Sequence, residues 1–372
     1  MTAPVASFPV RPRHGLVVGK FYPPHAGHHL LVRTAAATCE RVTVVIMAPT
    51  AQSIPIALRV AWMREEHRSR RNVTVLGTND DNPVDYASDA AWRAHVGLMI
   101  RVVRWVTDVP VDAVFTSEEY GDELARRLGA RHVCVDLGRS LRSISGTSVR
   151  ADPVGTWDHL APGVRAWFAR RVVVVGAEST GKTTLTRDLA AALRARGGAF
   201  GLTRSVVDGG KQLTADLLAR TRAQAQLDPR AAAALDQPIL RSEHFYAMAA
   251  EQNRLEDDAA RAGGPVLACD TDAFSTAVWH ERHLGRRSEE VESLARAHSL
   301  YLLAHPADVP FHEDALREAE RSWTTRLLTE RLAATGRRWR CVRGGREARL
   351  DAALAAVDEL LAEGWRLAPP LG

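Results

Sequence analysis

Residues 171–183 read Arg-Val-Val-Val-Val-Gly-Ala-Glu-Ser-Thr-Gly-Lys-Thr, an apolar run that leads into a glycine-rich loop. The loop satisfies the spacing G-x-x-x-x-G-K-[ST], and an amphipathic helical pattern begins at Lys182. A strand, such a loop and a helix place backbone N–H groups where they bind phosphate. We therefore predict a P-loop that binds ATP, in which Lys182 bridges phosphates and Thr183 binds Mg²⁺. The predicted ATP-binding residues are Gly176, Glu178, Ser179, Thr180, Gly181, Lys182, Thr183 and Thr184.

A second strand of the same region carries an acid at its tip. Residues 265–270 (Pro-Val-Leu-Ala-Cys-Asp) form an apolar run that ends in Asp270. An acidic residue at such a strand end holds the Mg²⁺ shell of a P-loop enzyme, directly or through water. Asp270 is therefore predicted as a metal-binding and catalytic residue together with Lys182. Asp272, two positions on, is expected to face substrate or solvent.

A different glycine-rich stretch follows the first apolar run of the chain. Residues 15–19 (Gly-Leu-Val-Val-Gly) predict a strand, and residues 19–28 (Gly-Lys-Phe-Tyr-Pro-Pro-His-Ala-Gly-His) place two imidazoles at the start of a helix. Histidines three apart also cap or pack helices, so the pair alone is ambiguous. Residues 144–150 (Ile-Ser-Gly-Thr-Ser-Val-Arg) add hydroxyls and an arginine at another helix start, which either holds phosphate or is an ordinary N-cap. The predicted ATP contacts are Gly19, Lys20, Phe21, His25, Gly27, His28, Ser145, Thr147 and Arg150.

Length and composition agree with two domains. The 372 residues are 46% apolar, enough for two cores, and strands alternate with helices in both halves. We predict a tail at 1–14, a Rossmann-like domain at 15–170 and a P-loop domain at 171–372, both with parallel sheets. No apolar run reaches the roughly 20 residues of a membrane span, so a soluble cytoplasmic protein is expected. The net charge is +5, but arginines are scattered among acids, and no nucleic-acid partner is expected. Only three lysines occur, Lys20, Lys182 and Lys211.

The paired motifs G-x-F-x-P-x-H-x-G-H and I-S-x-T-x-x-R resemble the nicotinamide mononucleotide (NMN) adenylyltransferases over residues 15–170. The resemblance implies in-line attack of a mononucleotide phosphate on the α-phosphorus of ATP, with Mg²⁺ and without a covalent intermediate. His25 and His28 would hold the ATP phosphates, and Ser145 and Arg150 the leaving pyrophosphate. The implied catalytic residues are His25, His28 and Arg150, and the implied NMN contacts are Trp92, Glu118 and Tyr120. Trp92 has an alternative role as a core aromatic.

The domain order, with residues 250–259 (AEQNRLEDDA) and 269–279 (CDTDAFSTAVW), resembles the NadR-type family of bifunctional NMN adenylyltransferases and ribosylnicotinamide kinases. This implies that the kinase converts nicotinamide riboside to NMN and that the first domain converts NMN to NAD. The segment 308–317 resembles a lid, so Arg317 would clamp ATP, although a solvated helix charge is the alternative. The implied riboside contacts are Arg204, Asp270 and Asp272.

Two departures from the family keep alternatives open. Relatives carry an acidic cluster around an arginine after the second kinase strand, whereas residues 200–205 (Phe-Gly-Leu-Thr-Arg-Ser) retain Arg204 without an adjacent carboxylate. About 14 residues precede the first strand, which leaves no room for the helix-turn-helix domain of some relatives. A P-loop domain that only regulates an active adenylyltransferase therefore remains an alternative. A sensor with two nucleotide sites is a second, and a phosphopantetheine adenylyltransferase, whose phosphate motifs are similar, is a third. The sequence leaves three questions open: whether the substrate is the nicotinamide or the nicotinic acid form, whether the chain forms homo-oligomers, and whether substrate is channelled between the two sites.

Overall fold

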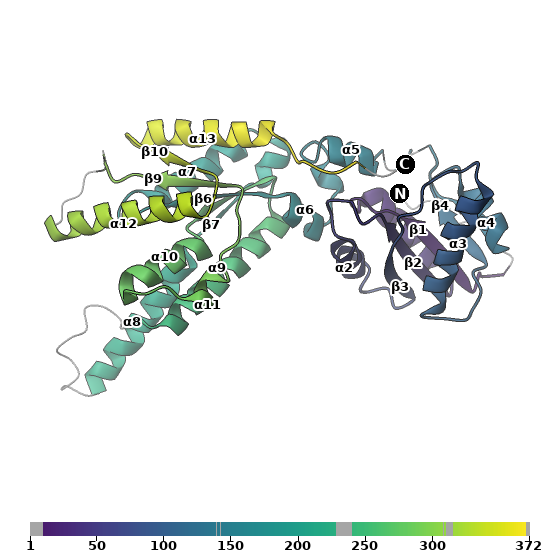
Figure 1. Cartoon of the computed structure of the whole chain (residues 1–372), viewed down its shortest axis with the longest axis horizontal. Helices are drawn as coiled ribbons and strands as arrows, with labels where there is room; N and C mark the ends of the chain where they lie inside the picture. The colour runs from purple at the N-terminus through teal and green to yellow at the C-terminus, as the bar shows by residue number, and fades with distance from the viewer. Residues whose placement is uncertain are drawn as a thin grey trace. The chain divides into compact units, whose positions relative to one another are not determined.

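The computed structural model describes residues 10–138, 140–141, 143–227, 240–307, 309 and 315–369. The chain forms two compact units, Met1–Val164 with Trp365–Gly372, and Arg165–Gly364. Each unit contains one five-stranded parallel sheet with helices on both faces (Figure 1). The division differs from the predicted one, because the boundary lies inside a helix at residue 164 and the described residues 365–369 belong to the first unit.

The first sheet has the strand order β3-β2-β1-β4-β5. Helices α1 and α2 pack on one face through residues such as Leu31 and Met63, and α3 and α4 pack on the other through Val96 and Leu124. The elements are β1 (His14–Gly19), α1 (Ala26–Thr38), β2 (Arg41–Ala48), α2 (Ile56–Glu66), β3 (Val73–Asn79), α3 (Asp89–Arg104), β4 (Ala113–Thr116), α4 (Gly121–Leu128), β5 (Arg131–Cys134), α5 (Gly146–Ala151), η1 (Trp157–His159) and α6 (Pro162–Phe168).

The second sheet has the order β10-β9-β6-β8-β7. Helices α7 and α13 bury their apolar faces together on one side of it through Leu189 and Val357. The elements are β6 (Arg170–Val175), α7 (Lys182–Ala195), η2 (Gly198–Leu202), β7 (Arg204–Val206), α8 (Gly209–Leu227), α9 (Ser242–Ala262), β8 (Val266–Asp270), α10 (Ala273–Leu284), α11 (Glu289–Glu292), β9 (Leu300–Ala304), α12 (Ala315–Ala334), β10 (Trp339–Val342) and α13 (Arg346–Ala362).

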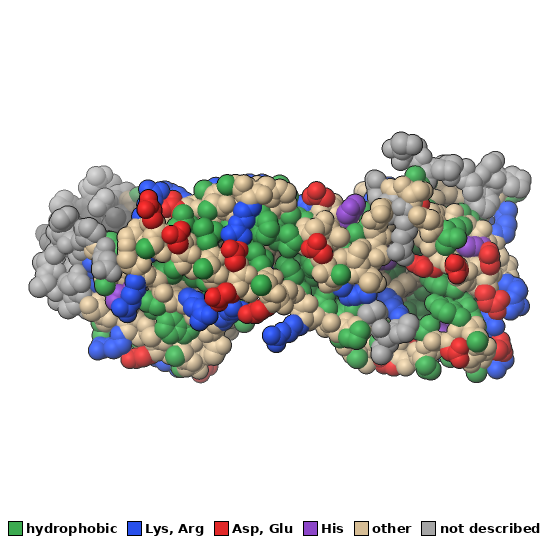
Figure 2. Space-filling model, turned by 90° about the horizontal axis from the view of Figure 1, so that it is seen from above, with side chains coloured by type: hydrophobic (Ala, Val, Ile, Leu, Met, Phe, Trp, Pro, Cys, Tyr) green, Lys and Arg blue, Asp and Glu red, His purple; other side chains and the backbone are tan. Residues whose placement is uncertain are grey.

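One face of the molecule agrees with the scattered charge pattern of the sequence. On the face shown in Figure 2, basic and acidic side chains are interspersed rather than gathered into a stripe of one sign. Within the part of the chain that the structure describes, no helix combines the length and the apolar character needed to cross a membrane.

Candidate functional site

The first unit contains a cavity of about 420 Å³ at the carboxyl ends of its strands. β1 and β4 are neighbours in the sheet, yet β1 leads into α1 on one face and β4 leads into α4 on the other. Open α/β sheets bind ligands at such a topological switch point. The cavity is lined by all of the predicted ATP and NMN contacts of this unit: Gly19, Lys20, Phe21, His25, Gly27, His28, Trp92, Glu118, Tyr120, Ser145, Thr147 and Arg150.

The two histidines of the first motif occupy fixed positions at the start of α1. His25 is the N-cap, and its Nδ1 accepts a hydrogen bond of 3.2 Å from the N–H of Gly27. Because Nδ1 accepts, the ring proton is on Nε2, which can donate to an anion. The ring centroid of His28 lies 3.8 Å from that of His25 and 4.7 Å from that of Phe21. Capping the helix and presenting an imidazole donor are therefore compatible roles for His25.

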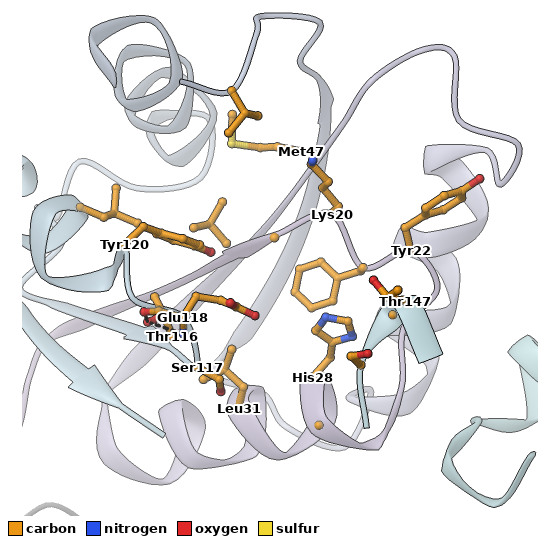
Figure 3. A pocket seen from close by; sticks show the side chains of 18 of the residues that line it. Lys20, Tyr22, His28, Leu31, Met47, Thr116, Ser117, Glu118, Tyr120 and Thr147 are labelled. Carbon is orange, nitrogen blue, oxygen red and sulfur yellow. Dashed lines mark hydrogen bonds between the residues drawn. The ribbon is translucent and has the colours of Figure 1, made fainter. Parts of the chain in front are cut away.

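The second motif meets the first through Arg150. Its guanidinium donates to the backbone carbonyl of Tyr22 at 2.6 Å and to the hydroxyl of Thr147 at 3.1 Å. Ser145 is the N-cap of α5, and its hydroxyl accepts from the N–H of Ser148 at 3.0 Å, so the capping alternative holds for that residue. Burial lowers the pKa of Lys20, and the nearby Arg150 lowers it further. Figure 3 shows Lys20, His28 and Thr147 around one end of the cavity.

The other end of the cavity has an aromatic and acidic wall. Tyr86 stacks on Tyr120 with ring centroids 5.9 Å apart and lies 5.8 Å from Trp92, whose indole N–H donates to the carbonyl of Tyr86 at 3.1 Å. Trp92 also packs in the core beneath α3, which agrees with its alternative role as a core aromatic, and its contact with NMN stays a prediction. In Figure 3, Glu118 and Tyr120 lie on this side. The flat apolar rings and the adjacent carboxylate suit a planar, positively charged aromatic ring.

Sequence reasoning missed several residues of this wall. Asp80 follows β3 and accepts a hydrogen bond of 2.5 Å from Nδ1 of His95 on α3, and both side chains line the cavity with Tyr86. The position of Asp80 directly after a parallel strand was a usable signal, because ligands gather at carboxyl strand ends. His95 and Tyr86 have no local motif, and only the packing of α3 brings them to the cavity.

In the second unit the P-loop joins β6 to α7. Gly176 has φ 157°, and a Cβ there would lie 2.7 Å from the carbonyl oxygen of Ala304, so the position admits only glycine. The ammonium of Lys182 donates to the carbonyl of Ala177 at 2.6 Å, and burial lowers its pKa. The hydroxyl of Thr183 donates to Oδ2 of Asp270 at 2.5 Å. The predicted phosphate loop and the predicted metal-binding pair thus lie together.

The pair formed by Thr183 and Asp270 fits Mg²⁺. Asp270 is 2% exposed, and its buried Oδ1 has no hydrogen-bond partner among the described residues. The described residues contain no group of three or more His, Cys, Asp or Glu side chains placed to hold a metal. A P-loop magnesium needs only one hydroxyl and one carboxylate because phosphates and waters complete its six oxygen ligands.

The structure places Arg204 away from the P-loop. This residue begins β7, where it pairs with Leu267, three positions before Asp270 on the parallel β8. Its exposed side chain therefore starts at the amino-terminal end of the sheet, opposite the P-loop, a position that does not favour the predicted riboside contact. Residues 200–205, which lack the acidic cluster, lie before and within β7 rather than after it.

The residues that follow β7 supply an acid beside the P-loop. Asp208 is mostly buried, and burial raises the pKa of its carboxyl group. Lys211 on α8 lies 3.8 Å from Oδ2 of Asp208, 3.1 Å from Oδ2 of Asp270 and 2.9 Å from the hydroxyl of Thr183. Two acids and a lysine therefore meet beside the P-loop. Sequence reasoning counted Lys211 but gave it no role.

Asp272 also departs from its predicted role. It is fully buried as the N-cap of α10, where Oδ1 accepts from the N–H and the hydroxyl of Ser275 at 2.9 and 2.8 Å. Oδ2 accepts from the hydroxyl of Tyr301 at 2.7 Å. Both carboxylate oxygens are committed inside the unit, so the prediction that Asp272 faces substrate or solvent is wrong.

Beside Asp272 lies a buried pair, Glu256 and His298, with Oε2 and Nε2 3.2 Å apart. Burial raises the pKa of Glu256 to about 8, with a further contribution from Asp272, and burial lowers the pKa of His298 to about 4. Arg171 lies 3.7 Å from the same carboxyl oxygen. At neutral pH a protonated Glu256 therefore faces a neutral imidazole, which needs no buried ion pair.

Glu256→Gln should flatten the pH dependence of stability between pH 6.5 and 8.5. The pKa of Glu256 in the folded state lies above its ordinary value of 4.5. Its contribution to the free energy of unfolding is therefore complete below pH 4.5 and is lost as pH rises through 8. His298 has the opposite effect, because its pKa is lowered in the folded state. Its contribution to the free energy of unfolding is lost as pH falls from 6.5 to 4. Thermal melts across this range should show the wild-type midpoint falling more steeply than that of Glu256→Gln. Glu251→Gln on the same helix should follow the wild type; parallel curves for all three proteins would refute the assignment.

Arg349 on α13 is hydrogen-bonded to the backbone of the P-loop. The sequence motifs did not predict this contact. Arg349 is 5% exposed, and its guanidinium donates to the carbonyl of Thr180 at 2.7 Å, of His305 at 2.6 Å and of Gly344 at 2.7 Å. Three loops that follow different strands are thereby tied to one side chain. A buried arginine far along the chain has no sequence signal that links it to the P-loop.

Arg349→Ala should destabilise the second unit by about 3 kcal/mol, because buried carbonyls lose their donors. The dissociation constant of ATP at the P-loop should rise about tenfold as the P-loop loses its support. Urea unfolding and calorimetric titration of ATP measure the two effects. Arg346→Ala, one turn earlier on the exposed side of α13, removes only a surface pair with Asp188 and should change neither quantity. Equal effects of the two changes would contradict the role of Arg349.

The predicted lid lies mostly outside the described residues. Residues 308 and 310–314 are not described, and Arg317 lies in α12 with its side chain also outside the described set. Its role as an ATP clamp stays a prediction.

Comparison with known proteins agrees with this arrangement. Residues 171–349 match the family model of an AAA domain. The trifunctional NAD biosynthesis/regulator protein NadR of Escherichia coli (strain K12) is 27% identical over 189 residues, 47% of this chain and 45% of the relative. Its namesake from Salmonella typhimurium is 26% identical over 197 residues, 49% of this chain and 47% of the relative. The chain thus spans about half the length of the curated relatives it matches.

Two solved structures share the fold. A NadR protein in complex with NR has a TM-score of 0.69 and 21% identity, covering 96% of this chain and 98% of that chain. A NadR protein in complex with NAD and AMP-PNP has a TM-score of 0.70 and 21% identity, covering 94% of this chain and 96% of that chain. The predicted resemblance is confirmed: this chain is similar to NadR proteins in sequence over about half its length and in fold over nearly all of it.

Proposed function

We propose that this chain is a two-domain NAD salvage enzyme. The second unit transfers the γ-phosphoryl group of ATP to the 5′-hydroxyl of nicotinamide riboside, giving NMN and ADP. The first unit joins the NMN phosphate to the α-phosphorus of ATP, giving NAD and pyrophosphate. The observation that carries the proposal is the cavity at the switch point of the first unit, which collects every residue predicted from the motifs of an adenylyltransferase.

In the first unit the protein's task is positioning and charge stabilisation. His25 and His28 donate to the ATP phosphates, while Arg150 and Lys20 offset the charge that develops on the leaving pyrophosphate. The aromatic wall of Trp92, together with Tyr86 and Tyr120, holds the pyridinium ring. These donors are in place before the reaction because the two motifs are already hydrogen-bonded to each other.

In the second unit Lys182 and the P-loop backbone bind the ATP phosphates. Thr183 and Asp270 would hold Mg²⁺, which would supply neutralisation of the negative charge on the ATP phosphates. Asp208 accepts the proton of the attacking 5′-hydroxyl, a task that its raised pKa favours. The presence of this acid beside the P-loop supports a catalytic P-loop domain over a regulator that only binds nucleotide. Cytoplasmic location, homo-oligomerisation and the lack of a nucleic-acid partner stay predictions.

The test uses purified full-length protein with Mg²⁺ and ATP. NMN should form from nicotinamide riboside, and NAD from NMN, each followed by chromatography. Asp208→Asn should lower kinase turnover by about 10²-fold or more while the P-loop still binds ATP, because only the proton acceptor is lost. Unchanged turnover in Asp208→Asn would remove that residue from the mechanism. Failure to form NMN with adenylyl transfer intact would favour the regulatory alternative; tight nucleotide binding without either product would favour a sensor.

A further inference from the structure

The segment 365–369 is hydrogen-bonded to the loop of the first motif. The hydroxyl of Tyr22 donates to the carbonyl of Ala368 at 2.8 Å, and the N–H of Ser53 donates to that hydroxyl at 3.2 Å. The N–H of Ala368 donates to the hydroxyl of Ser53 at 2.7 Å. The three residues thus form a closed ring of hydrogen bonds. Tyr22 is 2% exposed, so its hydroxyl depends on these partners rather than on water.

Tyr22 also contacts Arg150 through both its backbone and its ring. Besides the hydrogen bond from Arg150 to the carbonyl of Tyr22, the guanidinium carbon lies 5.1 Å from the centre of the Tyr22 ring. The buried guanidinium of Arg59 lies 4.5 Å from the same ring centre and donates to the carbonyl of Lys20 at 2.9 Å. Figure 3 shows the Tyr22 hydroxyl directed away from Lys20 and His28. Tyr22 therefore presents its backbone to the cavity side and its hydroxyl to Ala368.

Because the two motifs fit closely together, the position of Tyr22 affects the positions of Arg150 and of the start of α5. A Cβ at Gly146 would lie 3.0 Å from the carbonyl oxygen of Tyr22, so the start of α5 fits directly against this peptide. A small displacement of Tyr22 is then passed to Arg150 and to the start of α5. Displacements of about 1 Å in a catalytic group cost about 10²-fold in rate.

We propose that residues 365–369 are a positioning element of the adenylyl-transfer site. Ala368 fixes the hydroxyl of Tyr22, and Tyr22 fixes Arg150 in the orientation that stabilises the leaving pyrophosphate. The inference rests on the proposed function of the first unit and extends it to a segment that follows the whole kinase unit in the chain. Since Arg150 acts mainly on charge that develops in the transition state, loss of the segment lowers kcat more than it raises KM for NMN.

The experiment compares the full chain with a chain ended after Gly364. The shortened chain should form NAD from NMN with a kcat lowered about 10²-fold, while kinase turnover stays unchanged and reports a folded second unit. A synthetic peptide of residues 363–372, added in excess, should restore part of the lost kcat. A wild-type kcat in the shortened chain would overturn the proposal, and so would a loss expressed only in KM for NMN.

Point variants keep the proposal testable if the shortened chain does not fold. Tyr22→Phe and Ser53→Ala each break part of the ring and should lower kcat for NAD formation about tenfold, while their combination adds little because the ring acts as a unit. Arg366→Ala, an exposed neighbour in the segment, is the control and should match the wild type. A wild-type kcat in Tyr22→Phe would sink the idea.

Failure of the proposed function gives a different pattern. In that case the full-length wild type itself makes no NAD from NMN and ATP. Because Arg150 is assigned to the charge of the leaving pyrophosphate, the positioning role is then decided by calorimetric titration of pyrophosphate into Lys182→Ala protein with and without residues 365–372. Equal affinities of the two proteins would overturn it, and weaker binding by the shortened one would support it.

Discussion

Lys182→Ala is expected to lower kinase turnover by about 10³-fold, the upper range for losing one preorganised charge contact to a reacting oxyanion. The ammonium already lies 2.6 Å from the carbonyl of Ala177 inside the P-loop, so the protein places it before ATP arrives. NMN formation from nicotinamide riboside measures the effect. NAD formation from NMN should keep its wild-type rate, because the first unit has its own phosphate site.

Two further variants sharpen this test. Lys182→Arg should be nearly as inactive, since a planar guanidinium does not fit a loop shaped around a compact ammonium. Arg187→Ala, on the exposed side of the same helix, should leave turnover unchanged. Full kinase activity in Lys182→Ala would mean that the reaction takes place elsewhere.

His28→Ala should lower NAD formation by about 10²-fold to 10³-fold and leave kinase turnover intact. The imidazole lies at the mouth of α1, and its ring is held between His25 and Phe21. Its removal takes away one donor to the ATP phosphates without breaking the hydrogen bond from Arg150 to Tyr22. Initial rates of NAD formation at saturating ATP and NMN measure the loss.

His159→Ala provides the matched control in the same unit. His159 ends the short helix η1 and does not line the cavity, so its removal should leave NAD formation unchanged. If His28→Ala lowered both activities together, the change would report misfolding or coupling between sites. A wild-type rate in His28→Ala would exclude the histidine from adenylyl transfer.

The sequence predicted best what is contiguous. The P-loop follows its strand and opens its helix directly, so spacing alone indicated its geometry. The two motifs of the first unit are each within about ten residues, but their pairing was indicated by the resemblance to NMN adenylyltransferases. The sequence also indicated that Asp270 is buried, because this residue ends an apolar strand. Glu256, His298 and Arg349 could not be foreseen, because elements far apart in the chain bring each of them to its partners.

The errors have a common physical origin. β7 has only three residues, Arg204–Val206, and follows a glycine-rich turn, so periodicity gave no clear strand and the acid was sought on the wrong side of it. Asp272 carries a carboxylate near a strand end, yet its oxygens accept hydrogen bonds from Ser275 at the start of α10 and from the hydroxyl of Tyr301 inside the unit. A single cut at residue 170 also missed residues 365–369, which return to the first unit after α13.

The lysines have a practical consequence for chemical labelling. Lys20 lines the cavity of the first unit, Lys182 lies in the P-loop, and Lys211 lies beside Thr183 and Asp270. Since the chain contains no other lysine, amine-acylating reagents have no lysine target away from the two nucleotide sites. Acylation removes the positive charge of each ammonium. Mass spectrometry of the acylated protein, with and without ATP, would therefore report occupancy of the two sites separately, with each lysine as a built-in probe.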